Sequence, residues 1–169
     1  MSFGRAIASF FANYANFTGR ACRSEYWFAT LFVILVSIAC SLVDRAVGHQ
    51  VLQGIFGLAV FLPNLAIHVR RLHDTDRSGL WLVGVYVPGF ILVGAGASMM
   101  VAATVSGQAT KAGVAPGMTV FTLGIVSGIA SYVLLLVWMC MRGTFGPNRF
   151  GGDPLDDGVQ GYVPRPRRA

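Results

Sequence analysis

Charged side chains are scarce in this sequence of 169 residues: Asp, Glu, Lys and Arg together make up 12% of it. A typical soluble domain carries about 25% charged residues. Hydrophobic residues make up 54% of the chain and gather into four runs with almost no ionisable side chains. So little charge cannot cover a water-facing surface, which excludes an ordinary soluble domain. Runs of this kind are typical of helices that cross a lipid bilayer.

The sequence also lacks the motifs that bind metals or nucleotides. Its three cysteines have neither the spacing of a zinc site nor that of a disulfide framework. The Gly-rich stretch 143–152 lacks the Gly-Lys-Ser/Thr of a phosphate-binding loop. Residues 74–79 begin like a calcium loop, but the twelfth position is Val85, which has no carboxylate. We therefore expect no metal and no cofactor.

Four hydrophobic segments are predicted to cross the membrane as helices. They are residues 26–47, 51–67, 80–105 and 118–141. Small residues on their faces let helix backbones approach closely, and we expect them to join the spans within one chain rather than between chains. The expected fold class is an all-α membrane protein with four transmembrane helices in a bundle.

Two further segments flank the four spans. Residues 2–17 place aromatic side chains on one helical face and polar side chains on the other, which predicts an amphipathic N-terminal helix. Such a helix can lie in the membrane interface or pack on the protein's own end, and the two arrangements are compatible. Residues 1–155 are expected to form a single membrane domain, and 156–169 a basic, disordered cytoplasmic tail.

The distribution of basic residues predicts the orientation. Eleven arginines fall before the first span, between the second and third, or after the fourth: Arg5, Arg20, Arg23, Arg70, Arg71, Arg77, Arg142, Arg149, Arg165, Arg167 and Arg168. The loops on the opposite side carry two Lys or Arg residues, Arg45 and Lys111. Positively charged loops resist translocation, so we expect both termini in the cytoplasm. Basic residues beside hydrophobic spans favour anionic lipid headgroups, not nucleic acid, as the partner.

Three polar motifs stand at span boundaries on this side. They are Gly-Arg-x-x-Arg-x-Glu-Tyr-Trp at 19–27, Arg-Arg-Leu-His-Asp at 70–74 with Arg-Ser-Gly at 77–79, and Gly-x-Asn-Arg-Phe-Gly-x-Asp-Pro at 146–154. With these motifs in this order, the chain resembles the DUF805 family of small bacterial inner-membrane proteins over about residues 10–155. It departs from the family pattern at Leu80 and in the long loop 106–117. The resemblance implies an inner-membrane location and no particular activity.

The polar residues of these motifs form the candidate site. The residues that could bind a ligand or a lipid headgroup are Arg20, Arg23, Glu25, Arg70, Arg71, His73, Asp74, Arg77, Arg149 and Asp153. One interpretation is structural: the acidic residues neutralise the arginines, with Arg70 and Asp74 as an i, i+4 pair if the second span continues as a helix. Another is that the excess arginine grips phosphate on a lipid headgroup or a nucleotide.

The expected function is a non-enzymatic membrane component whose cytoplasmic Arg/Asp/His cluster is structural or binds anionic lipid or a protein partner, which includes a second copy of the chain. The alternative is a small membrane enzyme that acts on a lipid phosphate or headgroup. In that case His73 and Asp74 would serve as acid and base, since a histidine between carboxylates can move protons near neutral pH.

Overall fold

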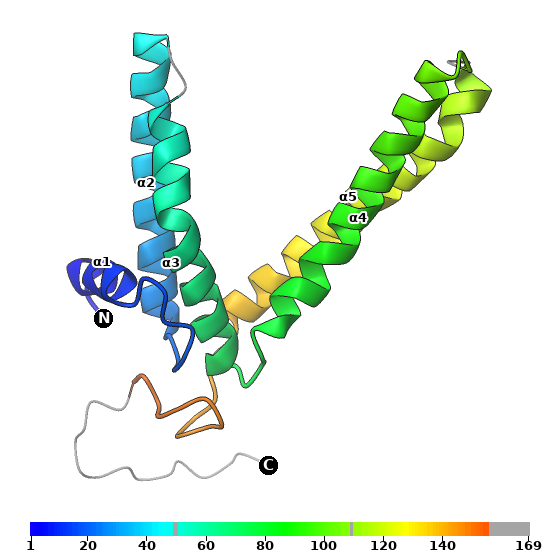
Figure 1. The fold of residues 1–169 in the computed structure, drawn as a ribbon. Helices are drawn as coiled ribbons and strands as arrows, with labels where there is room; N and C mark the ends of the chain where they lie inside the picture. Colours follow the sequence, from blue (N-terminus) through cyan, green and yellow to red (C-terminus); the bar gives the residue numbers. More distant parts are fainter. Residues whose placement is uncertain (49–50, 109, 156–169) are drawn as a thin grey trace. The chain divides into compact units, whose positions relative to one another are not determined.

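The computed structural model describes residues 1–48, 51–108 and 110–155, which form five α-helices and no strand (Figure 1). The helices are α1 (Phe3–Ala12), α2 (Arg23–Val47), α3 (Leu52–Asp74), α4 (Leu80–Val105) and α5 (Lys111–Cys140). The last four are long and apolar enough to cross a membrane, and the shortest of them has 23 residues. At 1.5 Å per residue this helix is about 35 Å long, against roughly 30 Å of hydrocarbon. The predicted all-α class with four spans is confirmed.

Three helices extend beyond their predicted spans, and one of them, α2, begins at Arg23 instead of residue 26. The helix of the second span continues through Pro63 to Asp74, whereas the prediction ended at residue 67. The fourth begins at Lys111, before the predicted start at 118. Hydropathy finds the segment that lipid can surround, but a helix continues wherever its backbone and packing allow. The predicted tail, 156–169, lies outside the described residues.

The chain divides into two compact units, one formed by residues 1–76 with the segment from Arg142 onward, the other by residues 77–141. In the first unit, α2 and α3 pack together and α1 lies across them (Figure 1). Phe10 of α1 is fully buried, and Phe11 contacts Phe32 of α2 edge to face, with ring centroids 5.8 Å apart. Tyr14 donates a hydrogen bond to the carbonyl of Ala59 in α3, at 2.5 Å. The amphipathic helix therefore packs on its own chain.

The turn between α2 and α3 is held by Asp44. Its carboxylate accepts hydrogen bonds from the backbone N–H groups of Leu52 and Gln53, at 3.0 and 2.8 Å. These N–H groups open α3 and have no partner within the helix, so the carboxylate caps it. Gly48 ends α2 at φ 77°, a conformation that favours glycine.

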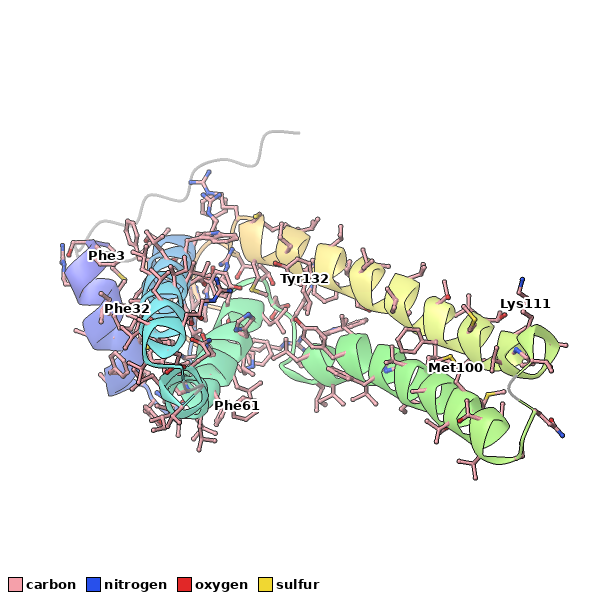
Figure 2. All side chains as sticks on the ribbon, turned by 90° about the horizontal axis from the view of Figure 1, so that it is seen from above. Phe3, Phe32, Phe61, Met100, Lys111 and Tyr132 are labelled. Carbon is pink, nitrogen blue, oxygen red and sulfur yellow. The ribbon has the colours of Figure 1, made fainter. Side chains whose placement is uncertain are left out.

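In the second unit, α4 and α5 pack through glycines. A Cβ on Gly124 of α5 would lie 2.6 Å from Val93 N, and one on Gly96 of α4 would lie 2.7 Å from Gly117 O. No side chain fits at either position, so the backbones touch. The small residues of α5 thus pack within one chain, as expected. On α4 the contact is made by Gly96, whereas the small residues Gly94, Ser98 and Ala102, which the sequence favours for this face, are exposed. Met100 fills the space beside Gly117 (Figure 2).

Candidate functional site

Two groups of buried ion pairs lie at the end of the α2–α3 pair where α2 begins and α3 ends. Asp74 pairs with Arg20 and Arg71, and Glu25 pairs with Arg70; we call these five residues together the ion-pair network. Arg20 donates from Nε at 3.0 Å and from Nη2 at 2.9 Å to Asp74 Oδ1, and Arg71 donates from Nη1 to Oδ2. The exposed fractions are 4% for Asp74, 8% for Arg20 and 0% for Arg71. The Asp74 carboxylate thus pairs with two arginines, one on either oxygen.

The second carboxylate of the network connects three helices. Glu25, in the first turn of α2, accepts hydrogen bonds from Arg70 Nη1 of α3 at 3.0 Å and from Ser9 Oγ of α1 at 2.8 Å. Among the described residues, Arg70 Nε is buried without a hydrogen-bond partner. The anticipated Arg70–Asp74 pair is wrong: Arg70 faces α2 and pairs with Glu25. Residues three and four apart both lie on one face of a helix, so either arginine could reach Asp74. Arg71 pairs with it, because Arg70 is bound by Glu25 of α2.

The segment after α5 folds onto Asp74 and Arg20. Arg20 donates to the carbonyls of Gly146 and Thr144, both at 2.6 Å, and Thr144 N donates to the backbone carbonyl of Asp74 at 2.8 Å. Gly143 passes so close that a Cβ there would lie 2.5 Å from Asp74 Cγ. Glycine is required at this position because the Asp74 carboxylate occupies the space.

His73 is fixed by the same segments. Its Nδ1 lies 3.1 Å from the carbonyl of Gly19, which can only accept, so Nδ1 carries the proton in this contact. The imidazole stacks on Phe150, with ring centroids 3.9 Å apart and planes 2° from parallel. Asn148 Nδ2 donates to the His73 carbonyl at 2.9 Å. His73 as a residue is 9% exposed, and Phe150 covers one face of its ring.

Two further charged residues order the C-terminal segment. Arg149 Nε pairs with Asp76 at 3.1 Å in the open, where the side chains are 62% and 48% exposed. Asp153 accepts hydrogen bonds from the backbone N–H groups of Gly146 and Leu155, both at 3.0 Å. Arg149 thus joins the segment to Asp76, and Asp153 closes turns within the segment that covers Asp74.

Most of the predicted site residues therefore gather in one unit. These are Arg20, Arg23, Glu25, Arg70, Arg71, His73, Asp74, Arg149 and Asp153. Arg77 belongs to the other unit, where its guanidinium lies 4.8 Å from the centre of the Trp138 ring.

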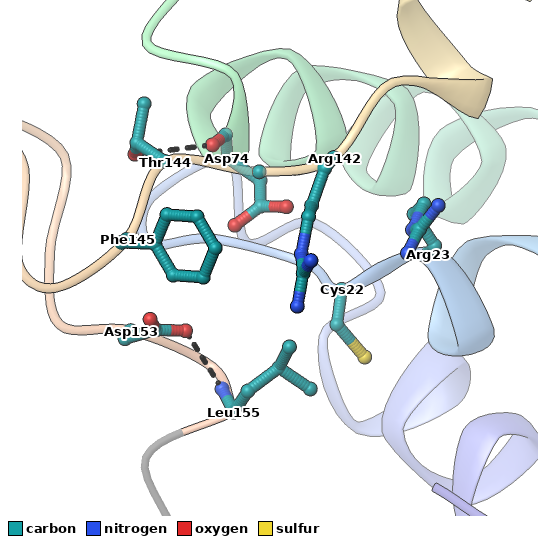
Figure 3. A pocket seen from close by; sticks show the side chains of 9 residues that line it. Cys22, Arg23, Asp74, Arg142, Thr144, Phe145, Asp153 and Leu155 are labelled. Carbon is teal, nitrogen blue, oxygen red and sulfur yellow. Dashed lines mark hydrogen bonds between the residues drawn. The ribbon is translucent and has the colours of Figure 1, made fainter. Parts of the chain in front are cut away.

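A cavity of about 40 Å³ opens beside the network (Figure 3). Its lining is Cys22, Arg23, Asp74, Arg142, Gly143, Thr144, Phe145, Asp153 and Leu155. Arg142 served in the sequence only to predict the orientation of the chain and was not among the predicted site residues. The roles of Thr144 and Phe150 were not predicted either. The one sequence signal for them was the Gly-rich motif after the fourth span, whose glycines allow close backbone approach.

The family model described as "Protein of unknown function (DUF805)" matches residues 14–152. The chain belongs to this family. It is 34% identical over 144 residues to the Inner membrane protein YhaI of Escherichia coli, with 84% of this chain and 88% of the relative covered. It is 32% identical over 148 residues to the Inner membrane protein YhaH of the same organism, with coverage of 84% and 89%. No solved structure matches the chain.

Family membership and four apolar helices together make the chain an integral membrane protein. Its three DUF805-like motifs, far apart in the sequence, meet at the ion-pair network. The first supplies Arg20 and Glu25, and the second supplies Arg70, Arg71 and Asp74. The third supplies the backbone of Gly146, which Arg20 binds.

Proposed function

We propose that this DUF805 chain is a non-enzymatic membrane component whose buried ion-pair network fastens its N- and C-terminal segments to one end of the α2–α3 pair. Both termini, and with them the network, face the cytoplasm. The proposal rests on the position of Asp74. Arginines bind both of its carboxylate oxygens, and the segment after α5 covers it.

The same position speaks against Asp74 as a catalytic group. A general acid or base must come within hydrogen-bond distance of the proton that it transfers. Asp74 is 4% exposed, and its two oxygens already accept from Arg20 and Arg71. The neighbouring histidine is also held, by Gly19 and by the Phe150 ring. This arrangement supports a structural role over the alternative enzyme with His73 and Asp74 as acid and base.

The orientation rests on the excess of arginine at this end of the helices. Arg20, Arg70 and Arg71 outnumber the two carboxylates of the network, and Arg23 adds a further positive charge. Segments rich in arginine stay in the cytoplasm. Burying three of these arginines needs counter-charges close by, which Glu25 and Asp74 provide.

Thermal unfolding of the full chain in detergent, with two matched variants, tests the structural role. Asp74→Asn keeps the shape of the side chain but leaves Arg20 and Arg71 without their counter-charge, and breaking a buried pair costs about 3–5 kcal/mol. Asp76→Asn removes an aspartate two residues away whose pair with Arg149 is exposed. Its expected cost is about 0–1 kcal/mol.

A marked fall in melting temperature for Asp74→Asn, with Asp76→Asn close to wild type, is the expected result. Equal melting temperatures for the two variants would contradict the proposed role, since the buried carboxylate would then matter no more than an exposed one.

A further inference from the structure

The cavity beside the ion-pair network contains two arginines that the network does not use. Arg23 and Arg142 both line it, and both are exposed. Within residues 1–48, 51–108 and 110–155, neither forms an ion pair with a carboxylate. The Arg142 guanidinium lies 4.7 Å from the centre of the Phe145 ring, which lines the same cavity (Figure 3). We infer that this cavity binds a phosphate group, with Arg23 and Arg142 as its ligands.

The charge around the cavity favours an anion. Four arginines and two aspartates line it or bind its lining: Arg20, Arg23, Arg71, Arg142, Asp74 and Asp153. Four positive and two negative charges leave a net charge of +2. Asp74 is bound by two arginines, and the Asp153 carboxylate accepts two backbone N–H groups. The positive charge that remains is on Arg23 and Arg142, and guanidinium groups bind phosphate through paired N–H donors.

The size of the cavity limits the ligand to a small group. Its volume is about 40 Å³, whereas sites for whole cofactors or drug-sized ligands span about 300–1,000 Å³. It can take a phosphate oxygen or a compact phosphate but not a nucleotide. Arg23 is the first residue of the apolar helix α2, and Arg142 lies two residues after the end of the apolar helix α5. Arginines at span ends are placed to meet lipid headgroups, so the phosphate can come from a lipid or from a soluble ester.

The inference rests on the proposed function, because the ion-pair network must hold the C-terminal segment in place for Arg142 to reach the cavity. The two can nevertheless fail separately. The stability of Asp74→Asn reports on the network, whereas phosphate binding by Arg23 and Arg142 variants reports on the cavity.

Native mass spectrometry of the full chain in detergent tests the cavity with two lipids that differ only in phosphate, phosphatidic acid and the diacylglycerol of the same acyl chains. The variant is Arg23→Gln/Arg142→Gln. The control is Arg45→Gln/Arg5→Gln, which removes the same charge from exposed arginines outside the cavity. A second arm measures thermal stabilisation by inorganic phosphate and so separates a soluble source from a lipid.

The expected result is that wild type and control bind phosphatidic acid over diacylglycerol, and that the cavity variant binds phosphatidic acid at least tenfold more weakly. Loss of phosphate stabilisation in that variant, without a change in lipid binding, would assign the site to a soluble phosphate. If the cavity variant bound both probes as wild type does, or if the control lost as much, the inference would be overturned. Should the double glutamine variant not fold, Arg23→Lys/Arg142→Lys retains the charge and loses the paired donors. It should still weaken binding, and unchanged binding would again overturn the inference.

Discussion

Replacing Gly143 with alanine should loosen the C-terminal segment from the network. The added Cβ would lie 2.5 Å from Asp74 Cγ, well inside contact distance. The carboxylate cannot retreat, because Arg20 and Arg71 hold its two oxygens. The backbone at residue 143 must move instead, and this movement strains the Thr144 N–H bond to the Asp74 carbonyl. Overpacking costs about 1–3 kcal/mol and a hydrogen bond about 1 kcal/mol, so we expect a loss of about 2–4 kcal/mol.

Gly152→Ala is the matched control for this substitution. It lies in the same segment, and among the described residues nothing lies within 4 Å of the Cβ that it would add. Thermal unfolding of the full chain in detergent should show Gly143→Ala melting well below wild type and Gly152→Ala close to it. If the two alanine variants melted together, the close packing of residue 143 on Asp74 would be refuted.

Two other predictions concern the far turn and the orientation. Asp44→Ala should lower the free energy of unfolding by about 0.5–2 kcal/mol, because α3 loses the carboxylate that caps the N–H groups of Leu52 and Gln53. Chemical unfolding of the variant and of wild type measures this difference. Equal free energies of unfolding would show that the cap contributes nothing. A C-terminal reporter that is active only in the cytoplasm should be active when fused after Ala169, whereas activity only of a reporter that requires export would reverse the proposed orientation.

The membrane helices could be predicted because lipid imposes one simple requirement on sequence. Long apolar runs without charge gave the number of spans and the fold class correctly. Their ends were less predictable. Helix α3 continues to Asp74 because its last turns contact residues 20–25 and bury Arg71 and Leu72. That burial depends on segments distant in sequence, so no local sequence pattern predicts where the helix ends.

The residues of the candidate site could be predicted from the sequence, but the ion pairs between them could not. Its arginines and acidic residues were recognisable, and most of them meet in one unit. Arg70 and Arg71 both lie within one helical turn of Asp74, so spacing alone does not decide which of them binds it. The packing of α2 against α3 decides this, because it places Glu25 beside Arg70. The close approach of Gly143 to Asp74 was equally hidden, because a glycine shows only that a side chain is absent and not what lies beside it.

The coupling energy between Arg20 and Asp74 measures whether the ion-pair network holds the N- and C-terminal segments on α2 and α3. Free energies of unfolding would be measured for Arg20→Gln, Asp74→Asn and the double variant, and compared with wild type. Residues in one ion-pair network typically couple by about 0.5–3 kcal/mol. Because this pair is buried and joined by two hydrogen bonds, we expect the upper part of that range. A coupling energy near zero, with the losses of the two single variants simply adding up, would contradict the claim that this network fastens the ends of the chain to α2 and α3.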